Sequence, residues 1–547
     1  MNRRQILILL FLSKCTGNGS LTVNYTPSAS VTHDCIEMTQ GSKYAMGGYA
    51  RFEQPQLKNT TTYLDLASPS IAVKPIRQAL VQVIDVKADR VIAWTKTDEA
   101  GLYSIRYDEP DGNTIRIRVL ARIYANAQNG NFRTDDSCNL LLSVLDNTSG
   151  AALYAVSSAE TSKGTGLVNV TAAYSPSRAS APFSVLDTTL TSAQTILAAK
   201  PDIIFKPLNL YWSPANTNAS GNVKTGLIGT TYFGQDVFSD STKGAIYVLG
   251  AANVDTDEYD SNVIAHEFGH YLEYAVYRSD SIGGAHSLSA LVDLSLAFSE
   301  AWGNFFSGVV QQNSVYTDSN GLNNASGLNF NLETNTANNV YNEASVQSAL
   351  WDIYDAAGDN GELVNCPLST MSKAFMGLKS DAAAVSYLSF ANVLQTQLQP
   401  CVSSGLTAIH TNLGTGTIAS SFSGTTQPTA ACRTAAYLTA TLPVYGDANT
   451  INLGFSSGGT NNYCAVKWYR VTGNGTTRTM TLSGISASCN LDLYVTQGSS
   501  IVALSKNSGL GVSESVTVSL TNAADYVIRI YTVTPNNGTC SYALNIT

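Results

Sequence analysis

The sequence predicts a multidomain protein in which one α+β domain is flanked by an N-terminal and a C-terminal all-β sandwich domain. The chain has 547 residues, which is more than one hydrophobic core usually serves. Alternating, β-branched runs dominate its N-terminal and C-terminal parts, whereas helical spacing is confined to the middle. A hydrophobic fraction of 44% supplies apolar side chains for several cores, and a charged fraction of 13% excludes a highly charged disordered chain.

Residues 1–20 have the pattern of an export signal. A basic start precedes the apolar run Ile6–Leu12, which is too short to span a bilayer. The following Leu-Ser-Lys-Cys resembles the lipobox of bacterial lipoproteins, although Lys14 replaces the small residue of that motif. The resemblance implies a lipid anchor at Cys15, and the alternative is plain cleavage. Both possibilities predict a secreted or cell-surface protein, and the lipid anchor predicts an outer-membrane lipoprotein. No later stretch of the sequence predicts a transmembrane helix.

The region 35–125 is predicted to form the N-terminal β-sandwich. Period-two runs separated by turn residues occur at Ala79–Asp85, Val91–Trp94 and Ile115–Leu120. The segment Thr97–Ile105 resembles the turn of transthyretin-like, carboxypeptidase-regulatory-type domains, because a glycine turn precedes an aromatic strand residue. The resemblance implies a spacer or a docking surface without chemistry of its own.

The middle of the chain is predicted to be the helical part. Residues 126–190 are rich in Ser, Thr, Asn and Ala with little periodicity, and predict a mixed connection of strands and loops. The domain at 191–411 follows, and a Ser/Thr/Gly-rich linker at 412–430 ends it. Helical spacing predicts four helices in that domain, at Ser261–Arg278, Ser287–Val310, Glu343–Ala356 and Ala382–Gln397.

The segment 431–547 is predicted to form the C-terminal β-sandwich. Alternating strands are expected at Asn490–Val495, Ser513–Val516, Asp525–Tyr531 and Tyr542–Ile546. Their order resembles the pre-peptidase C-terminal domain, an accessory module of secreted bacterial proteases. The alternative is an unrelated secreted sandwich, and neither version is catalytic.

The charge balance excludes nucleic acid as a partner. The chain has 31 Lys and Arg against 40 Asp and Glu, which gives a net charge of -9. No basic run stands out that would neutralise phosphates.

Nine cysteines without a Cys-x-x-Cys pair indicate disulfides in an oxidising compartment. Cys15 belongs to the export segment, so eight remain. We expect the pairs Cys366 with Cys401, Cys432 with Cys464 and Cys489 with Cys540, while Cys35 with Cys138 follows only by elimination.

The sequence His266-Glu267-Phe268-Gly269-His270 carries the predicted chemistry. Its apolar flanks place it on a helix, where residues four apart share one face. Two imidazoles in this arrangement bind one Zn²⁺, and Glu267 reaches the metal-bound water without being a ligand. The alternative is a buried helix with incidental histidines.

A third ligand is predicted on the second helix. The metzincin class is excluded, because Glu273 and Val276 stand where it requires Gly and His. Glu300 lies between Phe298 and Trp302, and burying a carboxylate among aromatic residues is costly unless a cation is present. Zinc is such a cation.

This layout resembles the gluzincins, the thermolysin-like metallopeptidases. The resemblance implies a zincin-like α+β fold, zinc ligands His266, His270 and Glu300, and a catalytic role for Glu267. Asn304 takes the place of the family's Asp, which supports a zinc histidine from behind. The loop Ser279–Ser287 makes the connection longer than in the family. Glu273 remains a rival ligand, because it shares a helical face with both histidines.

Substrate-binding groups are less well defined by the sequence. The apolar strand Gly244–Gly250 is interpreted either as the edge strand that pairs with an extended peptide or as a buried sheet strand. A side-chain donor should stabilise the oxyanion, and Tyr341, His286 and His410 are the candidates.

These features together predict an extracellular zinc-dependent metalloendopeptidase that acts on proteins or peptides. One alternative is a surface adhesin or matrix-binding protein with a vestigial metal site. A second is a peptidase restricted to the maturation of one partner protein.

Overall fold

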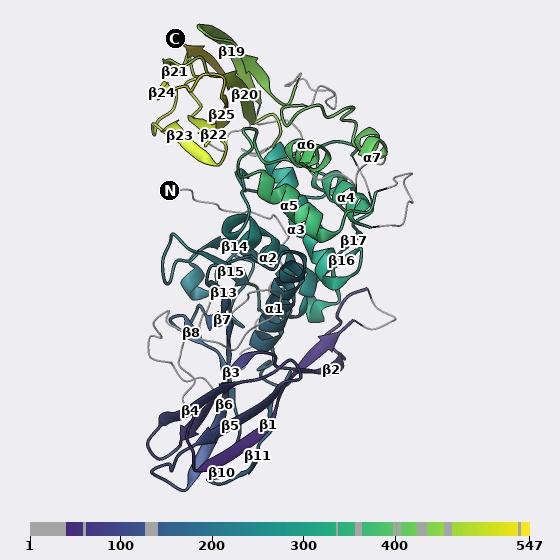
Figure 1. Cartoon of the computed structure of the whole chain (residues 1–547), viewed down its shortest axis with the longest axis vertical. Coiled ribbons are helices and arrows are strands. Elements are labelled where there is room, and N and C mark those ends of the chain that lie inside the picture. Colours follow the sequence, from purple (N-terminus) through teal and green to yellow (C-terminus); the bar gives the residue numbers. More distant parts are fainter. Residues whose placement is uncertain are drawn as a thin grey trace. The chain divides into compact units, whose positions relative to one another are not determined.

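The computed structural model describes residues 40–57, 62–125, 140–334, 337–355, 364–397, 401, 406–423, 435–452, 462–533 and 538–547. The chain divides into two compact units. The N-terminal unit comprises the described residues within 40–271 and 306–330, and the C-terminal unit those within 272–305 and 331–547. Extensive β-sheet and seven α-helices make up this described part, which is a mixture of α and β structure (Figure 1).

A ten-stranded sheet forms the centre of the N-terminal unit, with the main order β14-β15-β13-β7-β6-β3-β4. Strands β7, β13 and β15 run parallel, and β14 pairs antiparallel with β15 at one end. The strands are β3 (Ala79–Asp85), β4 (Arg90–Lys96), β6 (Thr114–Ala125), β7 (Leu140–Asp146), β8 (Ala152–Leu153), β9 (Ala155–Ser157), β10 (Thr161–Ser162), β13 (Leu208–Trp212), β14 (Tyr232–Gln235) and β15 (Gly244–Val248).

This sheet crosses the domain boundaries expected at 125 and 190. One edge of β6 pairs with β3 over Ile115–Ile123. The other edge pairs with β7 over Arg122–Ala125, and β7 pairs in turn with β13. Because one long strand serves both neighbours, the predicted sandwich and the strands of the predicted catalytic domain share a continuous hydrogen-bonded sheet.

A five-stranded sheet built around β1 is the second layer of the N-terminal unit. Its strands are β1 (Tyr44–Gln56), β2 (Ser70–Pro75), β5 (Leu102–Tyr107), β11 (Gly166–Leu167) and β12 (Val170–Ala172). The chain crosses to it from β4 by the predicted turn, in which Asp98 Oδ1 accepts from the N–H groups of Ala100 and Leu102. Gly101 has a φ of +72°, and a Cβ there would lie 2.4 Å from the carbonyl oxygen of Ala50, so glycine is required.

Helix α1 (Ala181–Ala199) packs against β1, β6 and β7, and the sequence did not predict it. The region contains several Ser and Thr residues, which favour loops in isolation. Here they bond to the preceding turn, as Thr189 does to the carbonyl of Val185 and Ser192 to that of Thr188. These bonds let a helix with thirteen buried residues bury hydroxyl groups without penalty.

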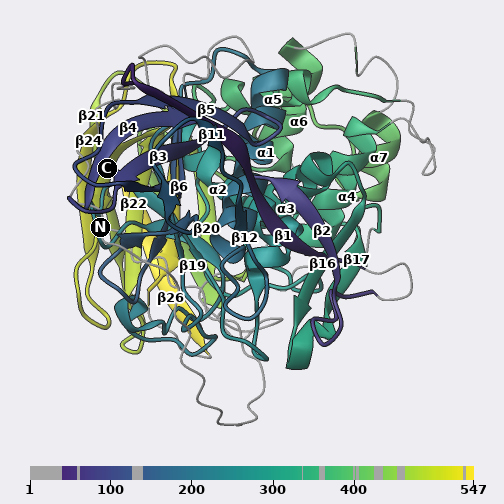
Figure 2. The same ribbon diagram turned by 90° about the horizontal axis from the view of Figure 1, so that it is seen from below.

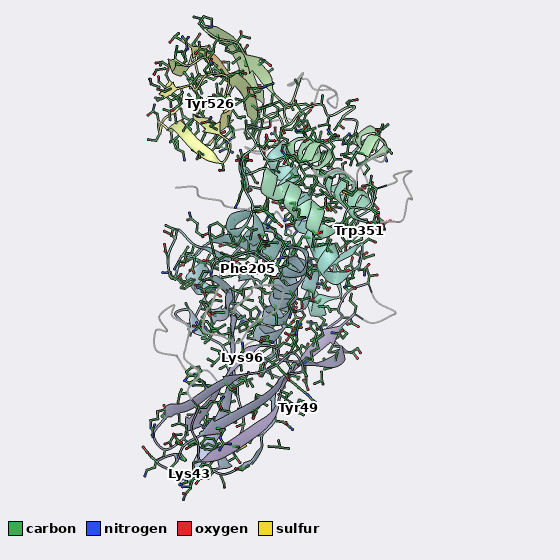
Figure 3. The ribbon with its side chains drawn as sticks, viewed as in Figure 1. Lys43, Tyr49, Lys96, Phe205, Trp351 and Tyr526 are labelled. Atoms are coloured by element: carbon green, nitrogen blue, oxygen red, sulfur yellow. A yellow bond between two sulfur atoms is a disulfide. The ribbon has the colours of Figure 1, made fainter. Side chains whose placement is uncertain are left out.

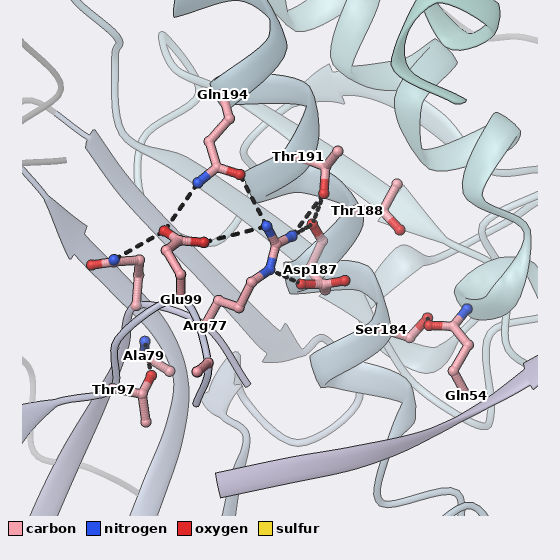
Figure 4. Close-up of polar contacts among 12 residues, drawn as sticks. Gln54, Arg77, Ala79, Thr97, Glu99, Ser184, Asp187, Thr188, Thr191 and Gln194 are labelled. Atoms are coloured by element: carbon pink, nitrogen blue, oxygen red, sulfur yellow. Dashed lines mark hydrogen bonds and ion pairs between the residues drawn. The ribbon is translucent and has the colours of Figure 1, made fainter. Parts of the chain in front are cut away.

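Arg77 ties the segment before β3 to α1 (Figure 4). Its guanidinium donates to Asp187 Oδ1 at 2.6 Å, to Thr191 Oγ1 at 2.7 Å and to Gln194 Oε1 at 3.0 Å. Both partners of the ion pair are mostly buried. The cluster therefore fixes the helix on the sheet by charge-assisted hydrogen bonds.

Two helices predicted around the motif are present, with different limits. They are α2 (Ser261–Ala275) and α3 (Leu294–Gln311). The expected start of α3 at Ser287 is wrong, because Asp293 ends the preceding loop and caps the helix by accepting from Ser295 N at 3.0 Å. The 3₁₀ turns η1 (Val223–Thr225), η2 (Asp257–Tyr259) and η3 (Leu322–Asn324) and the paired strands β16 (Val315–Asn320) and β17 (Ser326–Asn331) complete this part of the chain.

The remaining helices belong to the C-terminal unit. They are α4 (Glu343–Tyr354), α5 (Leu368–Gly377), α6 (Tyr387–Gln397) and α7 (Leu406–Asn412). Asn342 caps α4 as the sequence spacing allows, since its side chain accepts from Ser345 N. Helix α6 begins five residues later than expected, after Ser386 and Ser389 have bonded to each other's backbone N–H groups. Helices α5 and α7 were not predicted, and none of the described helices is long and apolar enough to cross a membrane.

The predicted C-terminal β-sandwich is confirmed, because two sheets share one core. Its strands are drawn in green to yellow in Figure 2. One sheet has the order β18-β20-β25-β22-β23 and the other β19-β26-β21-β24. Tyr526, labelled in Figure 3, is one of the core residues. The strands are β18 (Leu438–Ala440), β19 (Tyr445–Asn452), β20 (Val466–Thr472), β21 (Thr477–Ser483), β22 (Leu491–Gln497), β23 (Ser500–Ser505), β24 (Glu514–Ser519), β25 (Asp525–Thr532) and β26 (Thr539–Ile546).

Disulfides join Cys366 to Cys401 and Cys489 to Cys540, the partners that the sequence predicts. Cys464 is also disulfide-bonded. Its expected partner Cys432, together with Cys15, Cys35 and Cys138, lies outside the described residues. Such bonds are typical of proteins that fold outside the cytoplasm.

Replacing Arg77 by Met should loosen α1. The change leaves the largely buried Asp187 without its cation, and we expect the free energy of opening of α1 to fall by about 2 kcal/mol. Hydrogen exchange of the α1 amides measures this. The control is Arg116→Met, which removes an exposed pair with Glu160 and should change little. Equal protection of α1 in both variants would contradict the assignment.

Candidate metal site

Helix α2 places the two motif histidines one turn apart with their reactive atoms together. His266 Nε2 and His270 Nε2 lie 3.1 Å apart. A tetrahedral zinc ion with bonds of about 2.0–2.1 Å to each nitrogen separates two ligand nitrogens by roughly 3.3 Å. The pair is therefore arranged closely enough to share one metal ion.

The opposite face of α2 is held by aromatic packing within the N-terminal unit. The ring of Phe205, labelled in Figure 3, lies 6.3 Å from the rings of both Phe268 and Tyr271. The hydroxyl of Tyr271 donates to the carbonyl of Lys206. Because these residues fix the rotation of the helix about its axis, the histidines on the other face are held in a constant direction.

Glu267 is oriented by a backbone group of strand β14. Its Oε2 accepts a hydrogen bond from Phe233 N at 2.6 Å, and the side chain is buried. Strand β14 is the terminal strand of the ten-stranded sheet in the described part of the chain. The motif carboxylate therefore lies next to the end of the sheet.

Glu300, the predicted third ligand, lies on α3 in the C-terminal unit. Two imidazole nitrogens and one carboxylate oxygen are a donor set that zinc accepts in catalytic sites, with a further position left for water. The chemistry of the three side chains therefore suits the zinc ion that the sequence predicts, and their union in one site stays a prediction.

Glu273, the rival ligand, has a different partner. Its Oε2 accepts from the hydroxyl of Ser299 at 2.5 Å. The assignment of Glu300 as the third ligand, with Glu273 as its rival, stays a prediction.

Of the three oxyanion candidates, His286 lies beside a predicted ligand. Its Nε2 is 3.3 Å from Glu300 Oε2, and its Nδ1 is 2.6 Å from Glu343 Oε2 at the start of α4. The histidine stands at the end of the long connection Ser279–Ser287, which thus returns to the site. Its role as a donor stays a prediction.

The other two candidates are buried within the C-terminal unit. The ring of Tyr341 packs 5.4 Å from that of Tyr463. His410 lies on α7 with its ring 6.0 Å from Tyr387, and burial lowers the pKa of His410 to about 4. Asn304 donates from Nδ2 to Gln347 Oε1 at 2.8 Å, which fixes its amide, and its supporting role also stays a prediction.

The strand predicted to bind substrate proves to be an interior one. Strand β15 spans Gly244–Val248, is fully buried and pairs with both β13 and β14. The alternative of a buried sheet strand is thus correct, because β13 and β14 occupy the two edges of β15 and leave neither edge free for a peptide. An extended peptide would have to pair with β14.

Two site residues were missed by sequence reasoning, Phe233 and Tyr316. Tyr316 on β16 has its ring 6.3 Å from that of His266 and nearly perpendicular to it, and it stacks on Phe330. Burial, together with the charges of Asp318 and Glu267, holds the pKa of the Tyr316 hydroxyl well above its usual range. Neither residue belongs to a sequence motif. Tertiary packing alone brings Phe233 to Glu267 and Tyr316 to His266.

Comparison with known proteins identifies no family. No protein-family model matches the chain, and no curated protein matches it. One similar solved structure is the pre-peptidase C-terminal domain of a collagenase from Bacillus anthracis, with 10% identity, a TM-score of 0.16, and coverage of 20% of this chain and 94% of that one. A second is the g-type lysozyme inhibitor PliG of Aeromonas hydrophila, with 15% identity, a TM-score of 0.15, and coverage of 20% of this chain and 96% of that one. A third is the copper-binding CorA of Methylomicrobium album BG8, with 8% identity, a TM-score of 0.15, and coverage of 20% of this chain and 96% of that one. TM-scores this low establish no shared fold.

The buried imidazole of His410 should make the C-terminal unit sensitive to acid. The unfolded chain binds a proton to this side chain below about pH 6.5, whereas the folded chain does so only below about pH 4. The free energy of unfolding should therefore fall, by up to about 3 kcal/mol, as the pH is lowered through this window. Nuclear magnetic resonance of labelled histidine measures the midpoint. A value at or above 6.5 would contradict the burial effect, and His410→Gln should lack this part of the pH dependence.

Proposed function

We propose that the protein is an extracellular zinc-dependent metalloendopeptidase that hydrolyses peptide bonds. The observation that carries the proposal is the pair of His266 and His270, whose Nε2 atoms lie 3.1 Å apart, with Glu267 on the same helix. Glu300 is the third ligand that the sequence predicts. The disulfides support a location outside the cytoplasm. Metal-assisted hydrolysis requires one set of metal ligands and, beside it, a carboxylate that accepts the proton of the attacking water.

Each residue has a distinct role in the proposed reaction. His266, His270 and Glu300 hold the zinc ion, which when bound polarises the substrate carbonyl and lowers the pKa of water. Glu267 accepts a proton from the attacking water and delivers it to the leaving amine. The N–H of Phe233 holds one oxygen of the Glu267 carboxylate and so orients the group for this transfer.

The substrate is proposed to bind as an extended peptide along β14. That strand ends the sheet in the described residues, and its Phe233 contacts the catalytic carboxylate. A peptide that adds to a sheet end gains main-chain hydrogen bonds with little demand on its side chains. This mode suits cleavage within protein or peptide chains of varied sequence.

The C-terminal β-sandwich is proposed to be an accessory module. It resembles a pre-peptidase C-terminal domain in its strand order and contributes no residue to the proposed metal site. The N-terminal strands, whose turn resembles carboxypeptidase-regulatory domains, share their sheet with β14 and are proposed to support that strand. Attachment by a lipid at Cys15, which lies outside the described residues, would hold the enzyme at a membrane surface.

Replacing Glu267 by Gln should abolish turnover and leave the metal in place. The amide keeps the size of the side chain but accepts no proton, so we expect a fall in kcat of at least about a hundredfold. Zinc should stay near one equivalent per chain. Turnover is measured by digestion of a peptide library, and the bound zinc is measured by metal quantification. The matched control is Glu160→Gln, which changes an exposed ion pair with Arg116.

The same experiment separates the alternatives. Full proteolysis by purified Glu267→Gln protein would overturn the mechanism. Wild-type protein without bound zinc and without cleavage would instead support the adhesin with a vestigial site. Cleavage of casein would argue against an enzyme limited to one partner protein.

A further inference from the structure

A second cluster of potential ligands lies within the N-terminal unit and contains only carboxylates. Asp255 and Asp257 precede α2, and Asp318 lies on β16. Each offers one oxygen, and the three oxygens lie within 4.8 Å of one another. From this cluster we infer a separate binding site for a hard divalent cation, Ca²⁺, which does not depend on the proposed peptidase function.

Several buried carboxylate oxygens of this part of the chain lack hydrogen-bond partners. Asp257 is only 3% exposed; its Oδ2 accepts from the hydroxyl of Thr231, but its Oδ1 has no hydrogen-bond partner. Oδ1 of Asp255, Oδ1 of Asp318 and Oδ2 of the neighbouring Asp260 are likewise buried without partners. Folded proteins satisfy nearly all buried polar atoms, so several unpaired carboxylate oxygens in one cluster indicate a missing positive ligand.

No side-chain cation of the described residues neutralises the cluster. The nearby Arg178 pairs with Glu258 at 2.5 Å and donates to the carbonyl of Gly250. None of the ion pairs in the described part of the chain includes Asp255, Asp257 or Asp318. Three carboxylates at this spacing in a buried place repel one another unless a bound cation offsets their charge.

The chemistry of the ligands selects the ion. Oxygen ligands alone favour Ca²⁺, Mg²⁺ or Mn²⁺ over zinc, which prefers nitrogen and sulfur. Calcium takes six to eight oxygens, many of them from carboxylates, at about 2.3–2.6 Å in flexible geometry. Magnesium demands near-ideal octahedral geometry, keeps several waters and is usually held by one or two carboxylates. Three carboxylates from separate side chains in one cluster therefore suit calcium best.

The position of the site suggests what the ion does. Asp255 forms a β-bridge with Asn320, and Gly321 N donates to the carbonyl of Val254. The segment leading into α2 is thus already attached to the end of β16. A cation shared by both segments would fasten the start of the histidine-bearing helix to the strand that carries Tyr316.

Calcium titration of the full chain, stripped of metals by chelation, tests the inference. Calorimetry should show wild-type protein binding Ca²⁺ at this site, and Ca²⁺ should raise the unfolding temperature. The double variant Asp257→Asn/Asp318→Asn should bind at least about tenfold more weakly, because two charged ligands become neutral. Without Ca²⁺ it should be no less stable than wild type, since the repulsion is gone. Asp202→Asn, at an exposed pair with Lys200, is the control and should match wild type.

Several outcomes would overturn the inference. They are wild-type protein that binds no Ca²⁺, a double variant that binds it as wild type does, and tighter binding of MgCl₂ than of CaCl₂. The single variant Asp318→Asn guards against misfolding of the double variant. If it folds, as circular dichroism shows, and yet keeps wild-type affinity for Ca²⁺, the proposed ligand set is wrong.

Discussion

The structure of the candidate site depends on how helix α2 is seated in the N-terminal unit. Phe268 and Tyr271 on one face pack against Phe205, which leaves His266 and His270 on the other face with their Nε2 atoms 3.1 Å apart. A rotation of the helix by one residue would turn each imidazole by about 100° and separate the pair from its partners. Aromatic packing on one face of the helix therefore fixes the direction of the two histidines on the other face.

Buried carboxylates around this helix impose the second constraint. Each of them needs a proton, a donor or a cation, because an isolated charge in a dry interior is unstable. Glu267 has the backbone N–H of Phe233, and Glu258 has Arg178. The group of Asp255, Asp257 and Asp318 has no such cation in the described residues. A bound metal ion is the simplest solution for that cluster.

The sequence predicted what is encoded locally. The spacing of His266 and His270 needs only one helical turn, and the strands of the C-terminal sandwich follow from alternation. Features that depend on distant segments were missed. Phe233 reaches Glu267 through a backbone atom, which no side-chain motif encodes. Helix α1 was missed because its Ser and Thr residues favour loops when judged by sequence alone. The sheet crosses an expected domain boundary because β6 has a different partner on each edge.

The central claim is that His266, His270 and Glu300 coordinate one zinc ion. X-ray absorption spectroscopy at the zinc edge on the purified full chain tests it most directly, because it reports the type and distance of each ligand atom. The account predicts one zinc ion with two imidazole nitrogens near 2.0–2.1 Å, the remaining ligands being oxygen. A zinc ion bound by sulfur, or bound without imidazole, would contradict it.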